Sequence, residues 1–379
     1  MPHSLGPLDG VTGVVTVDLA QVAANWQALA YLAAPAGCAA VVKADAYGLG
    51  AADVVPALLR VGCRTFFVAT ADEAWQVRAL ARGAVIYVLD GLVGGAGPRL
   101  ADIGARPALA TFDDCLEWAA LCESRDRVMA AALHIDTGLN RLGLPAGDVT
   151  ALAADASLFK RINVSLVMSH LACADVPGDP MNAAQLAAFE QLRGALPQAP
   201  ASLAASDGLM LGPEYHFDLV RPGYALYGGQ AVKGRAAPVA PAVHVQARVL
   251  QVREVAAGQT VGYGAAWRAP RPSRIATIAA GYADGCARGA SATNAVPGGQ
   301  VGHNGRLAPI VGRVSMDLIT ADVTGLGDNA PRRGDFVDLI GPGLTLEAVG
   351  AAAGTIGYEI LTRLPRRFIR RVLPVKAEV

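Results

Sequence analysis

The sequence predicts an α/β fold, with an N-terminal (β/α)8 barrel over residues 1–232 and a C-terminal, mainly β domain over residues 233–379. Three observations lead to this prediction. Eight apolar segments of strand length are mostly separated by helical patterns, as in a barrel of parallel strands. No G-x-G-x-x-G motif follows the first of them, which disfavours the alternative, an open doubly wound sheet. After Gly228 the alternation stops, and strands joined by turns replace it.

The barrel strands are expected where apolar runs end at turn residues or polar side chains. In chain order they cover residues 38–43, 65–70, 84–90, 106–112, 128–137, 163–171, 201–206 and 217–223. A further short strand, 14–17, precedes them. Helices are expected at 18–32, 51–59, 113–123 and 182–196, and a capping box at residues 70–73 begins another.

Residues 230–241 are rich in Ala, Pro and Gly and are expected to form a linker. The C-terminal domain is then expected to contain strands at 244–255, 274–280, 310–322, 336–341 and 367–373. Only residues 345–353 have a helical pattern there, with Thr345 as the N-cap.

Composition limits the possible function. Hydrophobic residues make up 53% of the 379 residues and charged residues 17%, so the chain can bury a sizeable core. The formal net charge is zero and no basic run occurs, so we expect no binding to nucleic acid or to a membrane. Six scattered cysteines and the lack of a signal-peptide pattern favour a cytoplasmic protein with reduced thiols. The six histidines lack metal-ligand spacing, so no metal site is expected.

Polar side chains gather at the carboxyl ends of several predicted barrel strands, where barrel enzymes place their active sites. They are Lys43, segment 136–141, His170, Ser206 and segment 221–223. Partial burial at a strand end would lower the pKa of a lysine amine and leave it free to form a Schiff base. A serine hydroxyl and the backbone N–H groups of the last loop could cradle a phosphate. A lysine, a phosphate cradle and a buried arginine on one face would suit a pyridoxal phosphate enzyme.

Each of these residues also has a purely structural interpretation. Lys43 could extend past the strand end into solvent, His170 could be a hydrogen-bonded core histidine, and Arg221 could form a surface ion pair. The Tyr-Gly pairs at 47–48, 227–228 and 263–264 could be turns closed by an aromatic ring. Residue types and spacing therefore indicate a phosphate-cofactor enzyme and leave its reaction open.

The sequence resembles the alanine racemase family of fold-type III pyridoxal phosphate enzymes. The segment AVVKADAYGLG at residues 40–50 is similar to the cofactor-lysine signature of that family. Further similar segments follow in the same order along both domains: DTGLNRLG (136–143), SHLACAD (169–175), VRPGYALYG (220–228), VGYGAAW (261–267), AGYADG (280–285), GRVSMD (312–317) and TIGYEI (355–360). The resemblance implies an isomerase that uses pyridoxal 5′-phosphate to interconvert L-alanine and D-alanine and supplies D-alanine for peptidoglycan.

The resemblance also implies the catalytic residues. Lys43 would bind the cofactor covalently and act as one catalytic base, and Tyr263 would be the other base on the opposite face of the substrate. Racemisation needs one base on each face, because one removes the Cα proton and the other returns it. A homodimer with shared active sites is implied, in which each subunit completes its partner's site with Tyr263, Tyr282, Met316 and Asp317.

Cofactor contacts follow from the same resemblance. The phosphate ligands would be Tyr47, Ser206, Gly223, Tyr224 and Tyr358. Arg221 would face the pyridine nitrogen, with His170 nearby, and Arg141 would contact the cofactor phenolate and the substrate carboxylate. Because a guanidinium does not give up its proton, the cofactor ring would stay unprotonated and act as a weaker electron sink.

The chain departs from the family pattern at several positions. His134 stands where the family commonly has a carbamylated lysine; its imidazole could accept a hydrogen bond from Arg141, or a bound anion could replace the carbamate. Ala205 replaces a usual asparagine, and Asp207 places a negative charge near the predicted phosphate. Ser202 stands where some members have a histidine bonded to the pyridine-facing arginine.

Three other functions are alternatives to alanine racemisation. A racemase of broader specificity, acting on serine or other small amino acids, would differ only in pocket residues. A fold-type III decarboxylase would share the lysine but would have no reason to retain Tyr263. A pyridoxal phosphate carrier protein without turnover would need no C-terminal domain with that tyrosine.

Overall fold

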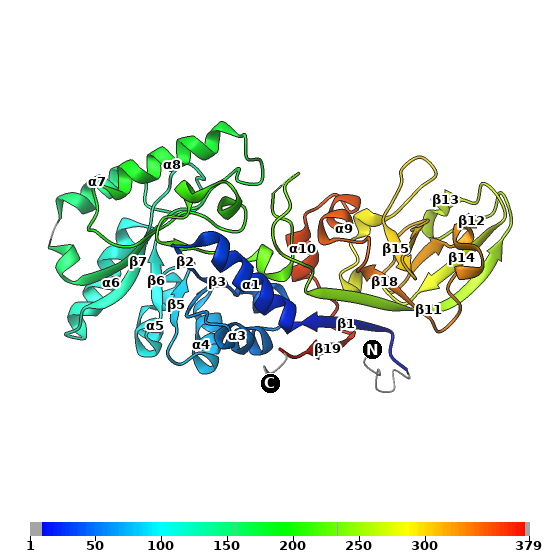
Figure 1. Cartoon of the computed structure of the whole chain (residues 1–379), viewed down its shortest axis with the longest axis horizontal. Coiled ribbons are helices and arrows are strands. Elements are labelled where there is room, and N and C mark those ends of the chain that lie inside the picture. Colours follow the sequence, from blue (N-terminus) through cyan, green and yellow to red (C-terminus); the bar gives the residue numbers. More distant parts are fainter. Residues whose placement is uncertain (1–9, 156, 233, 376–379) are drawn as a thin grey trace. The chain divides into compact units, whose positions relative to one another are not determined.

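The computed structural model describes residues 10–155, 157–232 and 234–375 (Figure 1). The chain divides into two compact units. The first, called the barrel unit here, comprises residues 20–240. The second, called the C-terminal unit, combines residues 10–19 with residues 241–375.

The barrel unit is built on short parallel strands. In chain order they are β2 (Gly37–Cys38), β3 (Ala40–Val41), β4 (Thr65–Val68), β5 (Val85–Val88), β6 (Arg106–Leu109), β7 (Met129–His134), β8 (Ile162–Met168), β9 (Ala201–Ser202) and β10 (Leu219–Val220). Strands β3 to β9 pair in sequence order, and β10 pairs with β2, which continues into β3 after one residue. Backbone hydrogen bonds from Asp218 to Ala201 (3.0 Å) and from Arg221 to Ala204 (2.9 Å) join β10 to the β9 segment. The sheet is therefore closed, which confirms the predicted barrel.

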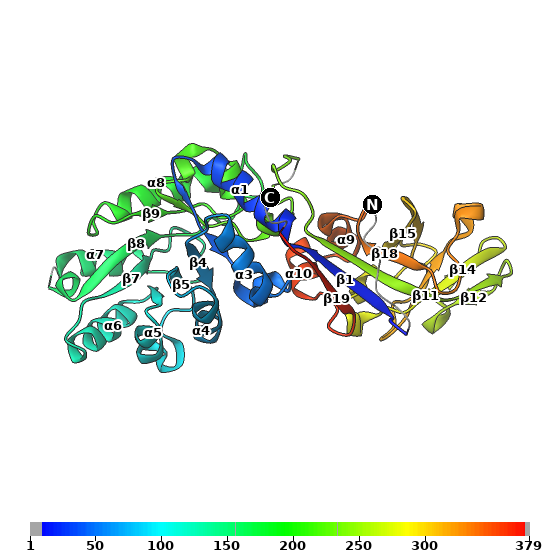
Figure 2. The same ribbon diagram turned by 60° about the horizontal axis from the view of Figure 1, so that its bottom comes forward.

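Helices cover the outside of these strands (Figure 2). They are α1 (Leu19–Ala33), α3 (Ala51–Arg60), α4 (Ala71–Leu80), α5 (Gly97–Ile103), α6 (Phe112–Ser124), α7 (Ala146–Ala154) and α8 (Pro180–Arg193). The predicted capping box is present, because Glu73 N–H donates to Thr70 Oγ1 (3.2 Å) and Thr70 N–H donates to Glu73 Oε2 (3.3 Å). Helices α5 and α7 were not predicted; both are short, and Gly and Ala give them little periodic pattern.

The C-terminal unit is mainly β. Its strands are β1 (Gly13–Asp18), β11 (Val243–Val255), β12 (Thr260–Val261), β13 (Trp267–Arg268), β14 (Ser273–Ile278), β15 (Gln300–His303), β16 (Arg306–Pro309), β17 (Ile319–Asp322), β18 (Phe336–Ile340) and β19 (Ile369–Leu373). Its helices are α9 (Leu346–Ala352) and α10 (Gly357–Thr362). The main sheet has the order β16-β15-β18-β11-β1-β19, and β14 pairs with β11 and β17. Strand β11 has 13 residues and pairs with β1 and β18 through its first part and with β14 through its second part. Its register shifts near Val245 and Val249.

Strand β1 differs from the sequence expectation, which grouped residues 1–232 with the barrel. It pairs antiparallel with β11 and parallel with β19 (Figure 2). Gly13 opens the strand, and the Phe368 ring lies where a Cβ at this position would be. The short apolar run showed that a strand would form, but it did not specify which strands it would pair with.

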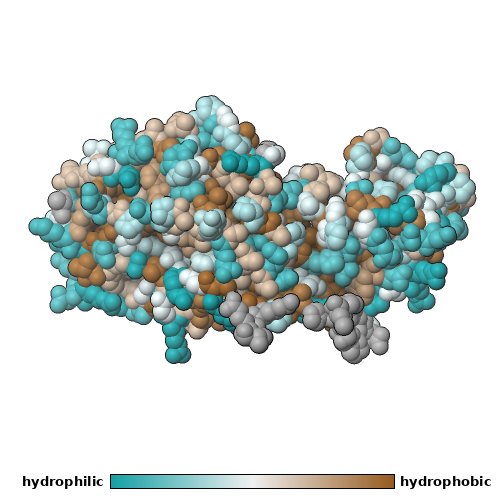
Figure 3. All heavy atoms as spheres, in the orientation of Figure 1, coloured by the Kyte–Doolittle hydropathy of each residue, from teal (hydrophilic) through white to brown (hydrophobic). Residues whose placement is uncertain are grey.

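Within the part of the chain that the structure describes, no helix has the length and apolar character needed to cross a membrane. On the face drawn in Figure 3, hydrophilic and hydrophobic side chains are intermixed over both units.

Candidate active site

Lys43 lies at the start of an unusual turn at the carboxyl end of β3. The strand ends at Val41, and the four residues from Ala44 to Tyr47 all have φ between 52° and 54°. Hydrogen bonds from Ala46 N–H to Val42 O (2.9 Å) and from Gly48 N–H to Ala44 O (2.8 Å) close one turn of left-handed helix. Left-handed helical backbone costs roughly 1–2 kcal/mol per L-residue, so the barrel unit must hold this turn in place.

Glu73 holds the turn against the next βα loop. Its carboxylate accepts hydrogen bonds from Ala44 N–H (2.6 Å) and from Ala69 N–H (2.7 Å). Asp45 adds a second bond, because its Oδ1 accepts from Ala51 N–H at 2.7 Å. Ala46 is fully buried, so packing also fixes the turn. The sequence interpretation treated Glu73 only as a helix cap, and its second function was missed.

The environment of Lys43 favours a free amine. Partial burial is the main cause that lowers the pKa of the Lys43 amine, and the positive charge of Arg141 lowers it further. Glu73 and Asp90 act in the opposite direction and do not reverse the shift. A larger share of this amine is therefore unprotonated near neutral pH than for an ordinary lysine.

Tyr47, at the end of the turn, faces the last barrel loop. Ser206 Oγ accepts hydrogen bonds from Gly223 N–H (3.0 Å) and Ala225 N–H (3.1 Å). A Cβ added at Gly223 would overlap the Tyr47 hydroxyl, so the absence of a side chain there leaves that hydroxyl room. Gly223 N–H and Ala225 N–H thus converge on the Ser206 hydroxyl, with the Tyr47 hydroxyl beside Gly223 and the buried Tyr224 between the two N–H groups in sequence. Donor groups of this kind are suited to a phosphate.

Arg221 is buried and has no carboxylate partner among the described residues, which contradicts its interpretation as a surface ion-pair residue. Its guanidinium donates to Ser202 Oγ and to Ser169 O (2.7 Å), and Ser202 Oγ donates to Leu219 O (2.5 Å). Burial lowers the pKa of Arg221 to about 10, so it remains charged at neutral pH. Ser202 therefore contacts this arginine directly, where other family members were expected to use a histidine.

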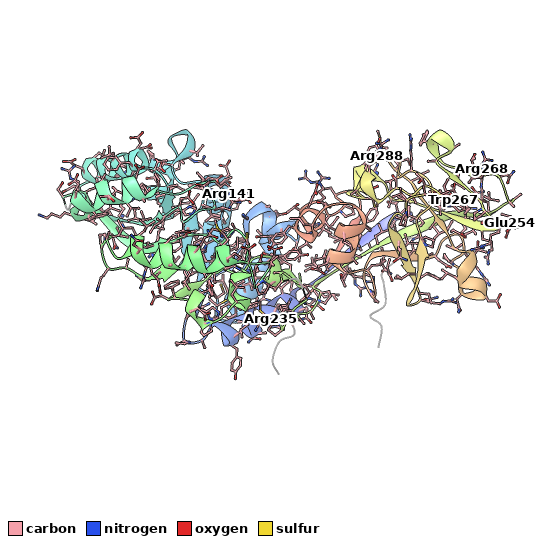
Figure 4. All side chains as sticks on the ribbon, turned by 90° about the horizontal axis from the view of Figure 1, so that it is seen from above. Arg141, Arg235, Glu254, Trp267, Arg268 and Arg288 are labelled. Carbon is pink, nitrogen blue, oxygen red and sulfur yellow. The ribbon has the colours of Figure 1, made fainter. Side chains whose placement is uncertain are left out.

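The two histidines of the site are held neutral. Burial, followed by the charges of Arg221 and Arg141, lowers the pKa of His134 to about 4 and that of His170 to about 3. His134 Nδ1 is buried without a hydrogen-bond partner. Arg141 is exposed on the barrel unit (Figure 4) and makes no hydrogen bond or ion pair with another described residue. The hydrogen bond considered between His134 and Arg141 is therefore absent from this structure.

The remaining predicted site residues belong to the C-terminal unit. Tyr263, Tyr282 and Met316 are 73%, 46% and 54% exposed. Tyr282 N–H donates to Ser315 O (3.0 Å) and Ala283 N–H donates to Met316 O (2.9 Å), so the segments around these residues lie side by side. The Tyr263 turn lies beside the same 312–317 segment, because a Cβ at Gly264 would be 3.1 Å from the Arg313 side chain. Asp317 lies in this segment, whereas Tyr358 lies on α10.

The neutral histidines predict how stability depends on pH. Unfolding returns both pKa values to about 6.5, so below that pH the unfolded chain binds more protons than the folded chain. The free energy of unfolding should therefore fall on acidification, and it should fall less in a His134→Asn variant, which lacks one of the two groups. Urea unfolding of both proteins between about pH 7 and about pH 4.5 measures this difference. Equal pH slopes would contradict the lowered pKa of His134.

Comparison with known proteins identifies the family of the chain. The family models described as "Alanine racemase, N-terminal domain" and "Alanine racemase, C-terminal domain" match residues 17–231 and 242–372. The alanine racemase of Methylobacterium nodulans is 50% identical over 360 residues, which are 95% of each chain. Two relatives from Agrobacterium fabrum, one named biosynthetic and one catabolic, are 45% and 44% identical; each alignment covers 95% of this chain and 93% or 92% of the relative.

A solved structure is also closely similar over the whole chain. The crystal structure of alanine racemase from Bartonella henselae, with covalently bound pyridoxal phosphate, superposes with a TM-score of 0.91. That protein is 41% identical, and the match covers 96% of this chain and 99% of the other. Because both family models and full-length relatives match, the chain belongs to the alanine racemase family.

Proposed function

We propose that this protein uses pyridoxal 5′-phosphate to interconvert L-alanine and D-alanine, with Lys43 and Tyr263 as the two bases. The observation that carries the proposal is the position of Lys43. Its amine has a lowered pKa, and the residue directly precedes the left-handed turn that ends at Tyr47. The Tyr47 hydroxyl lies beside Gly223, whose N–H donates to Ser206 Oγ.

The residues present fit this cofactor. Tyr47, Ser206 and the backbone at Gly223 and Tyr224 would hold its phosphate, and Tyr358 would be a further ligand. Arg221 would face the pyridine nitrogen, supported by Ser202, with His170 nearby. When bound, the cofactor supplies the electron sink that makes the substrate Cα proton acidic.

The protein's own groups then move that proton. Burial disfavours the protonated form of the Lys43 amine, which increases the share of this amine that can act as a base. The Tyr263 phenol would serve the other face of the substrate, so that one group removes the Cα proton and the other returns it. Arg141 is exposed and free to bind the substrate carboxylate, for which a guanidinium has matching geometry.

A homodimer is part of the proposal. Tyr263, Tyr282 and Met316 are large side chains left exposed by the fold, and residues of this type are enriched in protein interfaces. We infer that a second subunit covers these side chains of the C-terminal domain, residues 233–379. Together with Asp317 they would complete the active site of that subunit.

Substrate breadth and physiological role are further parts of the proposal. Alanine is favoured over serine because the family models carry that activity in their description. One methylene or hydroxyl in an apolar pocket discriminates by only about 1–3 kcal/mol, so serine is the substrate to compare. Supply of D-alanine to peptidoglycan is the physiological role that we propose. A cytoplasmic location is supported by the six cysteines, all described, which are free thiols.

Filling the proposed phosphate cradle should weaken cofactor binding. In Gly223→Ala the new methyl group overlaps the Tyr47 hydroxyl, so the dissociation constant for pyridoxal phosphate should rise about tenfold or more. Gly147→Ala, on α7 in open space, is the matched control and should bind as the wild type does. Absorbance titration of the apoproteins measures both constants. Unchanged affinity in Gly223→Ala would rule out this cradle as the phosphate site.

Activity is tested with alanine and serine in D2O, by chiral analysis of the product and by the deuterium content at Cα. The wild type should racemise alanine with deuterium incorporation, and Lys43→Ala should be inactive. Cofactor absorbance without Cα exchange would instead identify a carrier protein. Faster turnover of serine than of alanine would indicate the broader racemase.

The shared site predicts complementation between two inactive variants. Lys43→Ala and Tyr263→Phe subunits should each be inactive alone, whereas a mixed dimer contains one intact site. After random subunit exchange, half of the dimers are mixed, so about a quarter of wild-type activity should return. No recovery, despite exchange verified with differently tagged subunits, would contradict the shared site.

A further inference from the structure

An arginine in the C-terminal unit joins two of the segments that carry proposed site residues. Arg367 donates to both carboxylate oxygens of Asp284, from Nε at 2.8 Å and from Nη2 at 2.7 Å. Its remaining terminal nitrogen, Nη1, donates to Asp317 Oδ1 at 2.7 Å. The bidentate geometry with Asp284 is the stronger and more specific form of this interaction.

Asp284 is held by this arginine from a buried position. Only 3% of its surface is exposed, and its Oδ2 also accepts a hydrogen bond from Gly281 N–H at 3.1 Å. A buried carboxylate needs a charged partner, and removing that partner is strongly unfavourable. The two carboxylates in turn raise the pKa of Arg367 well above its ordinary value, so it stays charged. The pair therefore fixes the short helix Tyr282–Asp284 at its last residue, Asp284, two positions after Tyr282.

Packing fixes part of this segment, because a Cβ at Gly285 would overlap the Arg363 carbonyl oxygen, and a cavity borders the rest. Asp284, Gly285 and Cys286 line an apolar cavity of about 150 Å³ together with Arg363, Leu364 and Pro365. Side chains next to a void lose the contacts that would otherwise immobilise them. On the other side, backbone bonds join Tyr282 and Ala283 to the 315–316 segment, and a Cβ at Gly281 would overlap the Met316 carbonyl oxygen. The segments that carry Tyr282, Met316 and Asp317 are thus joined by backbone hydrogen bonds, and Arg367 bonds to both of them through Asp284 and Asp317.

We infer that Arg367 and Asp284 are positioning residues for substrate binding: they orient Tyr282 and Asp317 and neutralise the charge of Asp317. This inference rests on the proposed function, in which Tyr282 and Asp317 complete the partner's site. The substrate carries a carboxylate, and an unpaired Asp317 would repel it. Asp317 is half-exposed, so without Arg367 its charge would face the substrate unpaired.

The inference predicts a change in KM rather than in kcat. In Arg367→Gln the KM for alanine should rise about tenfold, with kcat changed by less than about threefold. Arg366→Gln is the matched control, because Arg366 is the exposed neighbour and makes no hydrogen bond or ion pair with another described residue. It removes the same charge and should leave KM unchanged. Arg367→Lys keeps the charge without the bidentate geometry and should be intermediate.

The double variant Arg367→Gln/Asp317→Asn separates positioning from general stability. Removing the unpaired carboxylate should recover part of the lost affinity for alanine, whereas damage to folding would persist. A tenfold rise in KM that Asp317→Asn relieves supports the inference. Unchanged KM in Arg367→Gln, or a loss in kcat alone, would overturn it.

Two further readouts keep the test decisive. Cofactor absorbance and sedimentation test whether Arg367→Gln remains a dimer that binds the cofactor. If this variant does not fold, Arg367→Lys and the single Asp317→Asn variant are compared instead. Under the inference, Asp317→Asn alone leaves the charge of Arg367 unpaired near the substrate carboxylate and lowers KM. An unchanged KM in both Arg367→Lys and Asp317→Asn would overturn the inference. A wild type that does not racemise alanine would overturn the proposed function as well, whereas normal wild-type activity with unaffected variants would overturn this inference alone.

Discussion

Four consecutive residues without a glycine, Ala44 to Tyr47, lie in the left-handed helical region directly after the first barrel strand, and the candidate site depends on that backbone turn. At roughly 1–2 kcal/mol per residue, the turn is too unfavourable to form by itself. Hydrogen bonds from two loops to Glu73, the bond from Ala51 to Asp45 and the burial of Ala46 stabilise it. A right-handed continuation would direct the side chains that follow Lys43 along a different path.

The same turn connects Lys43 to the proposed phosphate cradle. Tyr47 ends the turn, its ring lies 5.1 Å from that of Tyr227, and its hydroxyl occupies the space left by Gly223. Around Lys43 the charges of Arg141 and Arg221 lower the pKa values of nearby bases, so His134 and His170 remain neutral. The positive charge around Lys43 comes from these two arginines. It suits a site that binds an anionic cofactor and a substrate carboxylate.

Much of the barrel could be predicted from the sequence because its strands are apolar runs with polar ends, and the location of Lys43 followed from that pattern. The left-handed turn could not, since Ala-Asp-Ala-Tyr contains no glycine and its two alanines favour a right-handed helix. The β15–β16 hairpin was missed although Asn304-Gly305, both at positive φ, is a typical hairpin turn. The pairing of Arg367 with Asp284 joins residues 83 apart in sequence, and no local pattern indicates it.

Replacing Ala44 with glycine tests most directly whether the strained turn exists in the folded protein. Ala44 is exposed, and its N–H bond to Glu73 is retained in glycine, so the variant changes mainly the backbone preference. In a left-handed turn, Ala44→Gly should leave the free energy of unfolding unchanged or raise it by up to about 1 kcal/mol. Ala151→Gly, at an exposed site on the right-handed helix α7, should lower it by about 1 kcal/mol in the same urea titration. An equal loss in both variants would contradict the left-handed turn.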